Sequence, residues 1–175
     1  MSREEIVDEI HWARDDFRRL VDGAPTDELR MPSNGTKWTN DQLLFHMLFG
    51  YLIVRALLPL VTAFARLPRT YSRYFATALN AATRPFHVIN YVGSLCGARV
   101  LGHTGMERVM DRVTTSLVNS LRKADQKQLE RGMHFPVCWD PYFRDFMTIE
   151  DVSHYATQHY RHHRKQLTLS NAAAD

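Results

Sequence analysis

The chain has 175 residues, of which 45% are apolar and 23% charged, and its formal net charge is +3. This is the composition of an ordinary globular protein and is long enough for one domain with a hydrophobic core. Basic residues are scattered, and the absence of a polybasic run or an aromatic–basic pattern argues against nucleic-acid binding. The mild positive charge suits an anionic small molecule.

The cysteines and the N-terminus indicate the compartment. Cys96 and Cys138 are far apart and belong to no CxxC pair, which argues against a disulfide framework. The first ten residues are charged from the third position and lack the apolar core of a signal peptide. We therefore expect a cytoplasmic protein.

The first predicted helix begins after Ser2, which forms an S-x-x-E capping box with Glu5. Asp22 and Gly23 are typical of a helix end, and a polar, turn-rich loop follows. Between these limits the apolar residues recur at helical spacing: Ile6, Ile10, Ala13, Phe17 and Leu20.

The second predicted helix begins after Thr39, in a capping box with Gln42. Residues 43–64 have about the length of a membrane-spanning helix, but they include an arginine, Arg55, which is costly in lipid. We therefore predict a buried bundle helix that ends or kinks near Pro59, and no membrane contact.

The middle of the chain, from Pro59 to about Gly102, predicts one or two shorter helices. A third capping box, Thr104 with Glu107, predicts the start of an amphipathic helix that continues to about Gln126. Residues 130–147 are aromatic and irregular, which indicates a loop over one end of the bundle.

The last predicted helix begins at Thr148, where Glu150 and Asp151 complement the helix dipole, and continues to about Thr168. Since no strong strand alternation appears, we predict an all-α fold in a single domain over residues 1–170, with a frayed tail over 171–175.

Two histidines on the last helix occupy positions where the pattern expects apolar residues. His159 and His163 are four residues apart and lie on one helical face, so their imidazoles can point at a common metal ion. No glutamate follows His159, which excludes the HExxH metalloproteases. The alternative is that these histidines are hydrogen-bonded core residues.

His46 repeats this anomaly on the second helix. It shares a face with Leu43 and Ile53, and Gly50 on that face leaves room for a bulky neighbour. If the bundle brings His46 against the late pair, three imidazoles bind a divalent metal and leave a position open for water or substrate.

Residues 37–48, "KWTNDQLLFHML", and 151–167, "DVSHYATQHYRHHRKQL", together resemble the DinB/YfiT-like superfamily of small putative metalloenzymes. The resemblance implies a four-helix bundle, with additional short helices in this chain's middle segment. It also implies that His46, His159 and His163 bind zinc or nickel. Relatives include S-transferases that use mycothiol, bacillithiol or glutathione, and members often form homodimers.

From this resemblance we expect a metal-dependent transfer of a thiol cosubstrate to a small electrophile. His162 is expected at the rim, where it assists proton transfer, and His154 at the surface. Arg55 is considered for binding an anionic thiol cofactor, Gln166 for orienting an imidazole, and Trp38 as a core plug. The alternatives are a metal-dependent hydrolase, or a non-catalytic bundle that binds a small molecule or a protein partner.

Overall fold

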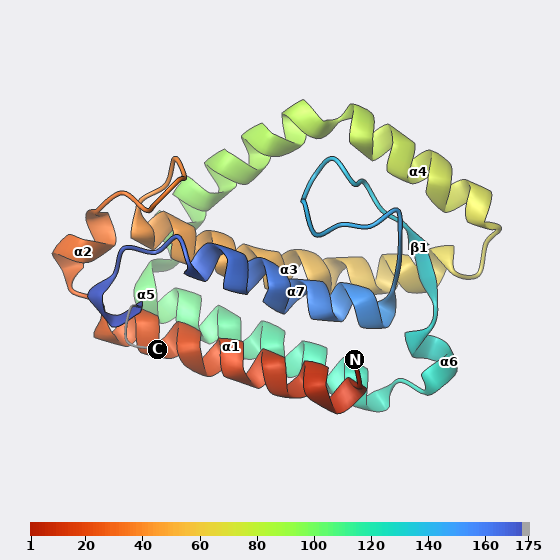
Figure 1. Ribbon diagram of the computed structural model, residues 1–175, viewed down its shortest axis with the longest axis horizontal. Coiled ribbons are helices and arrows are strands. Elements are labelled where there is room, and N and C mark those ends of the chain that lie inside the picture. Colours follow the sequence, from red (N-terminus) through yellow and green to blue (C-terminus); the bar gives the residue numbers. More distant parts are fainter. Residues whose placement is uncertain (173–175) are drawn as a thin grey trace.

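In the computed structural model, which describes residues 1–172, four long helical segments lie side by side in a bundle (Figure 1). Both α1 and α3 pack against α5 and α7, so the core lies between these four segments. The prediction of an all-α four-helix bundle with additional middle helices is confirmed. The bundle is formed by α1 (Arg3–Gly23), α3 (Asn40–Phe64), the second half of α5 (Thr83–Lys123) and α7 (Ile149–Arg164).

Side-chain caps begin three of these helices. Ser2 with Glu5, and Thr39 with Gln42, form the predicted capping boxes at α1 and α3. Thr148 caps α7 in the same way, with Asp151 as the reciprocal partner. Each cap satisfies backbone N–H groups that would otherwise lack partners and contributes about 1 kcal/mol to stability.

The helix α3 continues through Pro59 to Phe64, so of the predicted end or kink near Pro59 the end is wrong. Leu58 and Val61 on either side of the proline are buried, and their packing maintains the helix beyond it. By length and composition, α3 is the one helix within residues 1–172 that is long and apolar enough to cross a membrane. A core helix passes the same test, and α3 packs inside the bundle against α5 and α7.

The middle segment forms a roof above the bundle, made of α4 (Arg69–Ala81) and the first arm of α5, residues 83–101 (Figure 1). The helix α5 is broken at Gly102, whose φ is 57° and ψ −179°. The sequence placed the start of the third bundle helix at Thr104; the structure changes direction two residues earlier because glycine alone tolerates this backbone conformation readily.

A short hairpin precedes α7. Its strands β1 (Gly132–His134) and β2 (Phe146–Thr148) pair antiparallel, so the predicted irregular loop over 130–147 is wrong at both ends. The enclosed loop, residues 135–145, lies between the roof and the bundle (Figure 1). Trp139 anchors it, because its Nε1 donates to the Leu79 carbonyl at 2.8 Å and its ring stacks on Phe86 at 3.9 Å.

The end of the chain departs from the predicted helix. Instead of continuing to Thr168, α7 ends at Arg164 because the Thr168 N–H bonds to the buried Asn40 side chain at 3.0 Å. Of the predicted tail, residues 173–175 lie outside the described part of the chain. Short helical turns complete the fold: α2 (Thr26–Arg30), α6 (Gln126–Leu129) and η1 (Ser170–Ala172), which includes the tail's first two residues.

Candidate metal centre

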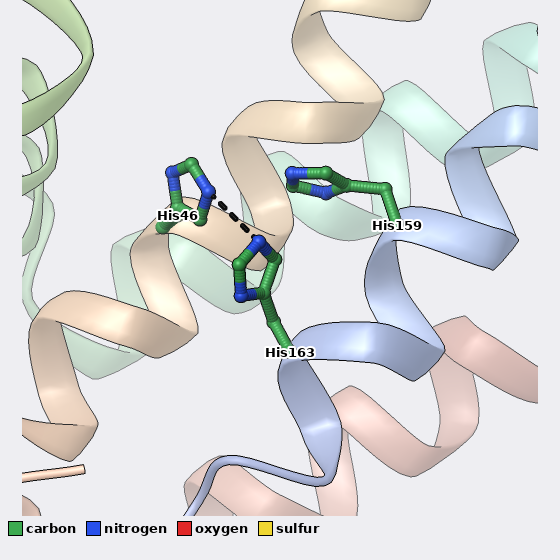
Figure 2. A group of neighbouring side chains, drawn as sticks. All are labelled: His46, His159 and His163. Atoms are coloured by element: carbon green, nitrogen blue, oxygen red, sulfur yellow. Dashed lines mark hydrogen bonds between the residues drawn. The ribbon is translucent and has the colours of Figure 1, made fainter. Parts of the chain in front are cut away.

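Three histidines from distant parts of the sequence meet in the bundle (Figure 2). His46 comes from α3, and His159 and His163 come from successive turns of α7. One nitrogen from each imidazole lies within 4.8 Å of the other two. His46 Nε2 and His163 Nε2 are 3.2 Å apart. The structure thus brings together the three residues that the sequence had grouped.

Hydrogen bonds on the far side of two imidazoles determine which nitrogens carry the lone pairs. His163 Nδ1 lies 2.7 Å from Gln166 Oε1, which only accepts, so Nδ1 carries the proton. Ser94 Oγ donates to the Asn90 carbonyl, so at 3.4 Å it accepts a long hydrogen bond from His46 Nδ1. Their Nε2 atoms lie 3.2 Å apart on the inner side, which is a hydrogen bond in the tautomer where one of them keeps its proton (Figure 2).

Burial keeps these imidazoles neutral. Burial and the neighbouring His163 lower the pKa of His46 to about 3. Burial likewise lowers the pKa of His163 to about 4. The pKa of His159 is held well below its usual range by burial and by the three adjacent histidines. Neutral imidazoles are the form that binds metals, so the cluster is ready to bind at neutral pH.

His159 occupies space that a glycine leaves open. A Cβ atom at Gly50 would lie 2.6 Å from His159 Nδ1, closer than real Cβ contacts allow. That Nδ1 atom is buried and has no hydrogen-bond partner among the described residues. A buried imidazole nitrogen without a partner costs free energy unless a ligand satisfies it.

These observations fit a divalent transition metal. Zinc–nitrogen bonds of about 2.1 Å place tetrahedral ligand nitrogens roughly 3.4 Å apart. The His46–His163 pair has this spacing, at 3.2 Å, and the nitrogen of His159 lies within 4.8 Å of both. A cation bound among these nitrogens would take the place of the hydrogen bond between His46 and His163. Gln166 and Ser94 occupy the outer positions that orient such ligands, which agrees with the role considered for Gln166.

Trp38 covers one side of the cluster. Its ring stacks on the His46 imidazole, with centroids 4.4 Å apart and planes inclined by 26°. The interpretation as a core plug is therefore incomplete, because the indole also holds the imidazole in position.

A pocket of about 450 Å³ opens beside the histidines, between the roof, the 135–145 loop, α3 and α7. Its walls are mostly apolar and aromatic, and the polar groups gather at the histidine end. The apolar walls comprise Phe49, Ile53, Leu57 and Leu60 of α3, Phe75 and Leu79 of α4, Phe86 of α5, and Met133, Phe135, Trp139 and Phe143 of the hairpin and its loop.

Asp140 is a residue that the sequence reasoning missed. Its Oδ2 accepts a hydrogen bond from the Tyr155 hydroxyl at 2.9 Å and lies 3.7 Å from His159 Nε2. Its Oδ1 accepts from the Tyr142 N–H at 2.8 Å. Burial raises the pKa of this carboxyl group. The only signal in the sequence was an acidic residue inside the aromatic stretch of residues 138–143.

Other residues considered from the sequence have different positions. Arg55 donates from Nε to Ser116 Oγ at 2.6 Å and lines a separate hollow beside α5. His162 lines the pocket, and its Nδ1 lies 3.2 Å from the Tyr142 hydroxyl. His154, expected at the surface, is half-buried and contacts Glu9 of α1 at 2.8 Å.

Comparison with known proteins agrees with this architecture. The sequence profile of the DinB superfamily matches residues 9–167. Among solved structures, YfiT from Bacillus subtilis, described as a probable metal-dependent hydrolase with an unusual four-helix bundle topology, superposes with a TM-score of 0.64. The two chains are 13% identical, and the match covers 96% of this chain and 86% of YfiT. The likeness to YfiT supports the fold. A search of curated proteins finds no match.

Proposed function

The chain belongs to the DinB superfamily, and we propose that it is a divalent-metal enzyme that transfers a small thiol to an electrophilic substrate. The observation that carries this proposal is the convergence of three neutral imidazoles at the polar end of an apolar pocket. Zinc or nickel is the proposed metal. When bound, either ion supplies a Lewis acid that lowers the pKa of a thiol toward neutral pH.

The residues of this chain have distinct proposed tasks. His46, His159 and His163 hold the metal, and Gln166 and Ser94 orient two of the imidazoles. The apolar walls exclude water and bind the body of the electrophile. In the reaction the thiol sulfur bonds to an electrophilic carbon, the leaving group departs with the electron pair of its bond, and the thiol proton passes to solvent. Participation of His162 in that proton transfer stays a prediction.

Hydrolysis is the second candidate, and Asp140 is the observation that favours it. A buried carboxylate near His159 is suitably placed to accept a proton from water. The two reactions are distinguished by incubating zinc-loaded protein with p-nitrophenyl esters and with thiol plus an aryl halide. Ester cleavage without thiol consumption would refute thiol transfer and support hydrolysis as the function.

The first experiment measures metal in untagged protein by mass spectrometry. Wild type is expected to hold close to one equivalent of zinc or nickel, and His46→Ala and His159→Ala are expected to lose it while remaining folded. His103→Ala is the matched control, because His103 is exposed and contacts Asp41 outside the cluster. A folded wild type that binds neither added metal would contradict the proposal.

The second experiment measures turnover. Zinc- or nickel-loaded protein is mixed with 1-chloro-2,4-dinitrobenzene and with glutathione, mycothiol or bacillithiol in turn. Conjugation by at least one thiol, lost on chelation and in His46→Ala, is the expected result. Stable metal binding without turnover of any thiol or ester would favour the non-catalytic alternative.

The homodimer and the cytoplasmic location remain proposals. Light scattering in solution tests whether the protein is a homodimer.

A further inference from the structure

We propose that the two substrates reach the histidines through two separate hollows: the apolar pocket binds the electrophile, and a second, polar hollow binds an anionic thiol. This assignment rests on the proposed thiol transfer. The second hollow has a volume of about 650 Å³ and shares Trp38, His87, Asn90 and His163 with the apolar pocket. The shared residues lie at and beside the histidine cluster, so a ligand in either hollow reaches it.

The second hollow is formed by three segments that are distant in sequence. The loop before α3 contributes one wall, the first arm of α5 another, and the end of α7 the third. Beyond the shared residues, its lining consists of Gly35, Thr36, Lys37, Val88, Tyr91 and Gln166. Four of these six residues carry a hydroxyl, amide or ammonium group, so this hollow offers a ligand more polar contacts than the first pocket.

The two hollows differ in the charge that they offer a ligand. Among the described residues that line the polar hollow, Lys37 is the only one with a full charge, and it is exposed and without an ion-pair partner there. Among those that line the apolar pocket, Asp140 is the only carboxylate and no lysine or arginine occurs. An anionic thiol is therefore attracted to the Lys37 side and disfavoured on the Asp140 side.

The surrounding sequence reinforces this preference. No aspartate or glutamate occurs between Asp41 and Glu107, whereas six arginines do. Two of these, Arg84 and Arg99, are exposed on the arm of α5 that forms one wall of the polar hollow. These positive charges on the arm attract small anions toward this side of the molecule.

An unpartnered polar atom lies where the hollows meet. Trp38 Nε1, a donor, is buried and has no hydrogen-bond partner among the described residues. Trp38 lines both hollows. A polar ligand that offers an acceptor at this junction would satisfy the indole N–H, which a purely apolar substrate cannot do.

The test measures binding to metal-free protein with probes that cannot react. The polar probes are the S-methyl derivatives of glutathione and bacillithiol, which carry carboxylates, measured by calorimetry. The apolar probe is N-phenyl-1-naphthylamine, measured by its fluorescence. We expect at least one S-methyl thiol to bind together with the apolar probe, without competition. Failure of both S-methyl thiols to bind, or mutual displacement of the probes, would overturn the assignment.

Matched variants locate each probe. Lys37→Met is expected to weaken binding of the S-methyl thiol about fivefold or more and to leave the apolar probe unchanged, whereas Lys127→Met, an exposed lysine on α6, changes neither. Ala56→Trp adds an indole to the exposed edge of the apolar pocket and is expected to weaken only the apolar probe. Ala63→Trp, exposed on the same helix, is its control. Equal effects of Lys37→Met on both probes would contradict separate sites.

These binding measurements separate the two proposals. Independent binding of both probes, combined with a metal-loaded protein that conjugates no thiol, would refute thiol transfer and leave the two binding sites in place. Conjugation activity combined with competing probes would refute the two sites and leave the reaction in place.

Discussion

Gly50 shows how one residue controls the position of a functional side chain. The missing Cβ atom leaves the space that the His159 imidazole occupies, and the nearest imidazole atom would lie 2.6 Å from a Cβ placed there. The sequence suggested this role, because Gly50 lies one turn after His46 on the same face of α3. What the spacing did not reveal is which histidine needs the space.

Gly50→Ala is expected to push His159 out of the cluster. Metal binding should weaken about tenfold or more, since small displacements of ligands are costly, while the helix itself tolerates alanine well. A competition titration with a fluorescent zinc chelator measures the affinity. Gly93→Ala is the control, because a Cβ atom there meets nothing within 4 Å. Unchanged affinity in Gly50→Ala would show that His159 is not needed for binding.

The aspartate in the 135–145 loop illustrates the limit of residue patterns. Asp140 has no periodic neighbours that would mark it as functional, and its link to His159 depends on Tyr155, one helical turn earlier on α7. Such a contact between a loop and a helix carries no signature in a single sequence.

Among the elements, α5 departs most from its prediction. Its second half matches the amphipathic helix predicted after Thr104, and Val113, Leu117 and Leu121 form its buried face. The first arm buries little beyond Ser94 and Ala98, so its periodic apolar signal is weak. Yet this arm supplies Asn90 and Tyr91 to the hollows and Ser94 to His46, and the break at Gly102 sets its direction.

Gly102→Ala is expected to lower the free energy of unfolding by about 1–3 kcal/mol, because its φ of 57° with ψ of −179° suits glycine alone. Urea titration monitored by circular dichroism measures the change. Gly93→Ala in the same helix has no positive φ and is expected to stabilise the protein by about 0.5–1 kcal/mol. A stabilised Gly102→Ala would mean that the backbone at this position does not require glycine.

The short elements were missed for a physical reason. Strands β1 and β2 have three residues each, too few for a period-two alternation to appear. The end of α7 was predicted too late because Leu167 continues the apolar face, whereas the chain leaves the helix to bond with Asn40, a residue 128 positions away.

On the scale of the whole molecule, burial of the histidine cluster affects stability. The folded-state pKa values of His46 and His163, about 3 and about 4, lie below the usual value of 6.5. Between about pH 4 and pH 6.5 the unfolded chain binds more protons than the folded chain. The free energy of unfolding of the metal-free protein should therefore fall as the pH decreases from about 6.5 to 4.

At pH 5 each of these two histidines is expected to lower the free energy of unfolding by about 2 kcal/mol relative to neutral pH. Urea titrations of chelator-treated protein at pH 7 and pH 5 measure the loss. The double variant His46→Gln, His163→Gln removes both titrating groups, so its stability should fall by about 2–4 kcal/mol less over the same interval. An equal loss in wild type and double variant would show that other groups control the acid sensitivity.

The sequence alone determined the helical class and the two bundle helices that carry the histidines, because helical periodicity and capping are local properties. The grouping of His46 with His159 and His163 was implied by the family resemblance, and the structure brings the three together. Only the tertiary structure decided the path of the middle segment, the hairpin, and the position of Asp140 near His159. It also decided that two hollows of different polarity meet at Trp38 and Asn90. Those features depend on contacts between residues distant in the chain, which no local pattern encodes.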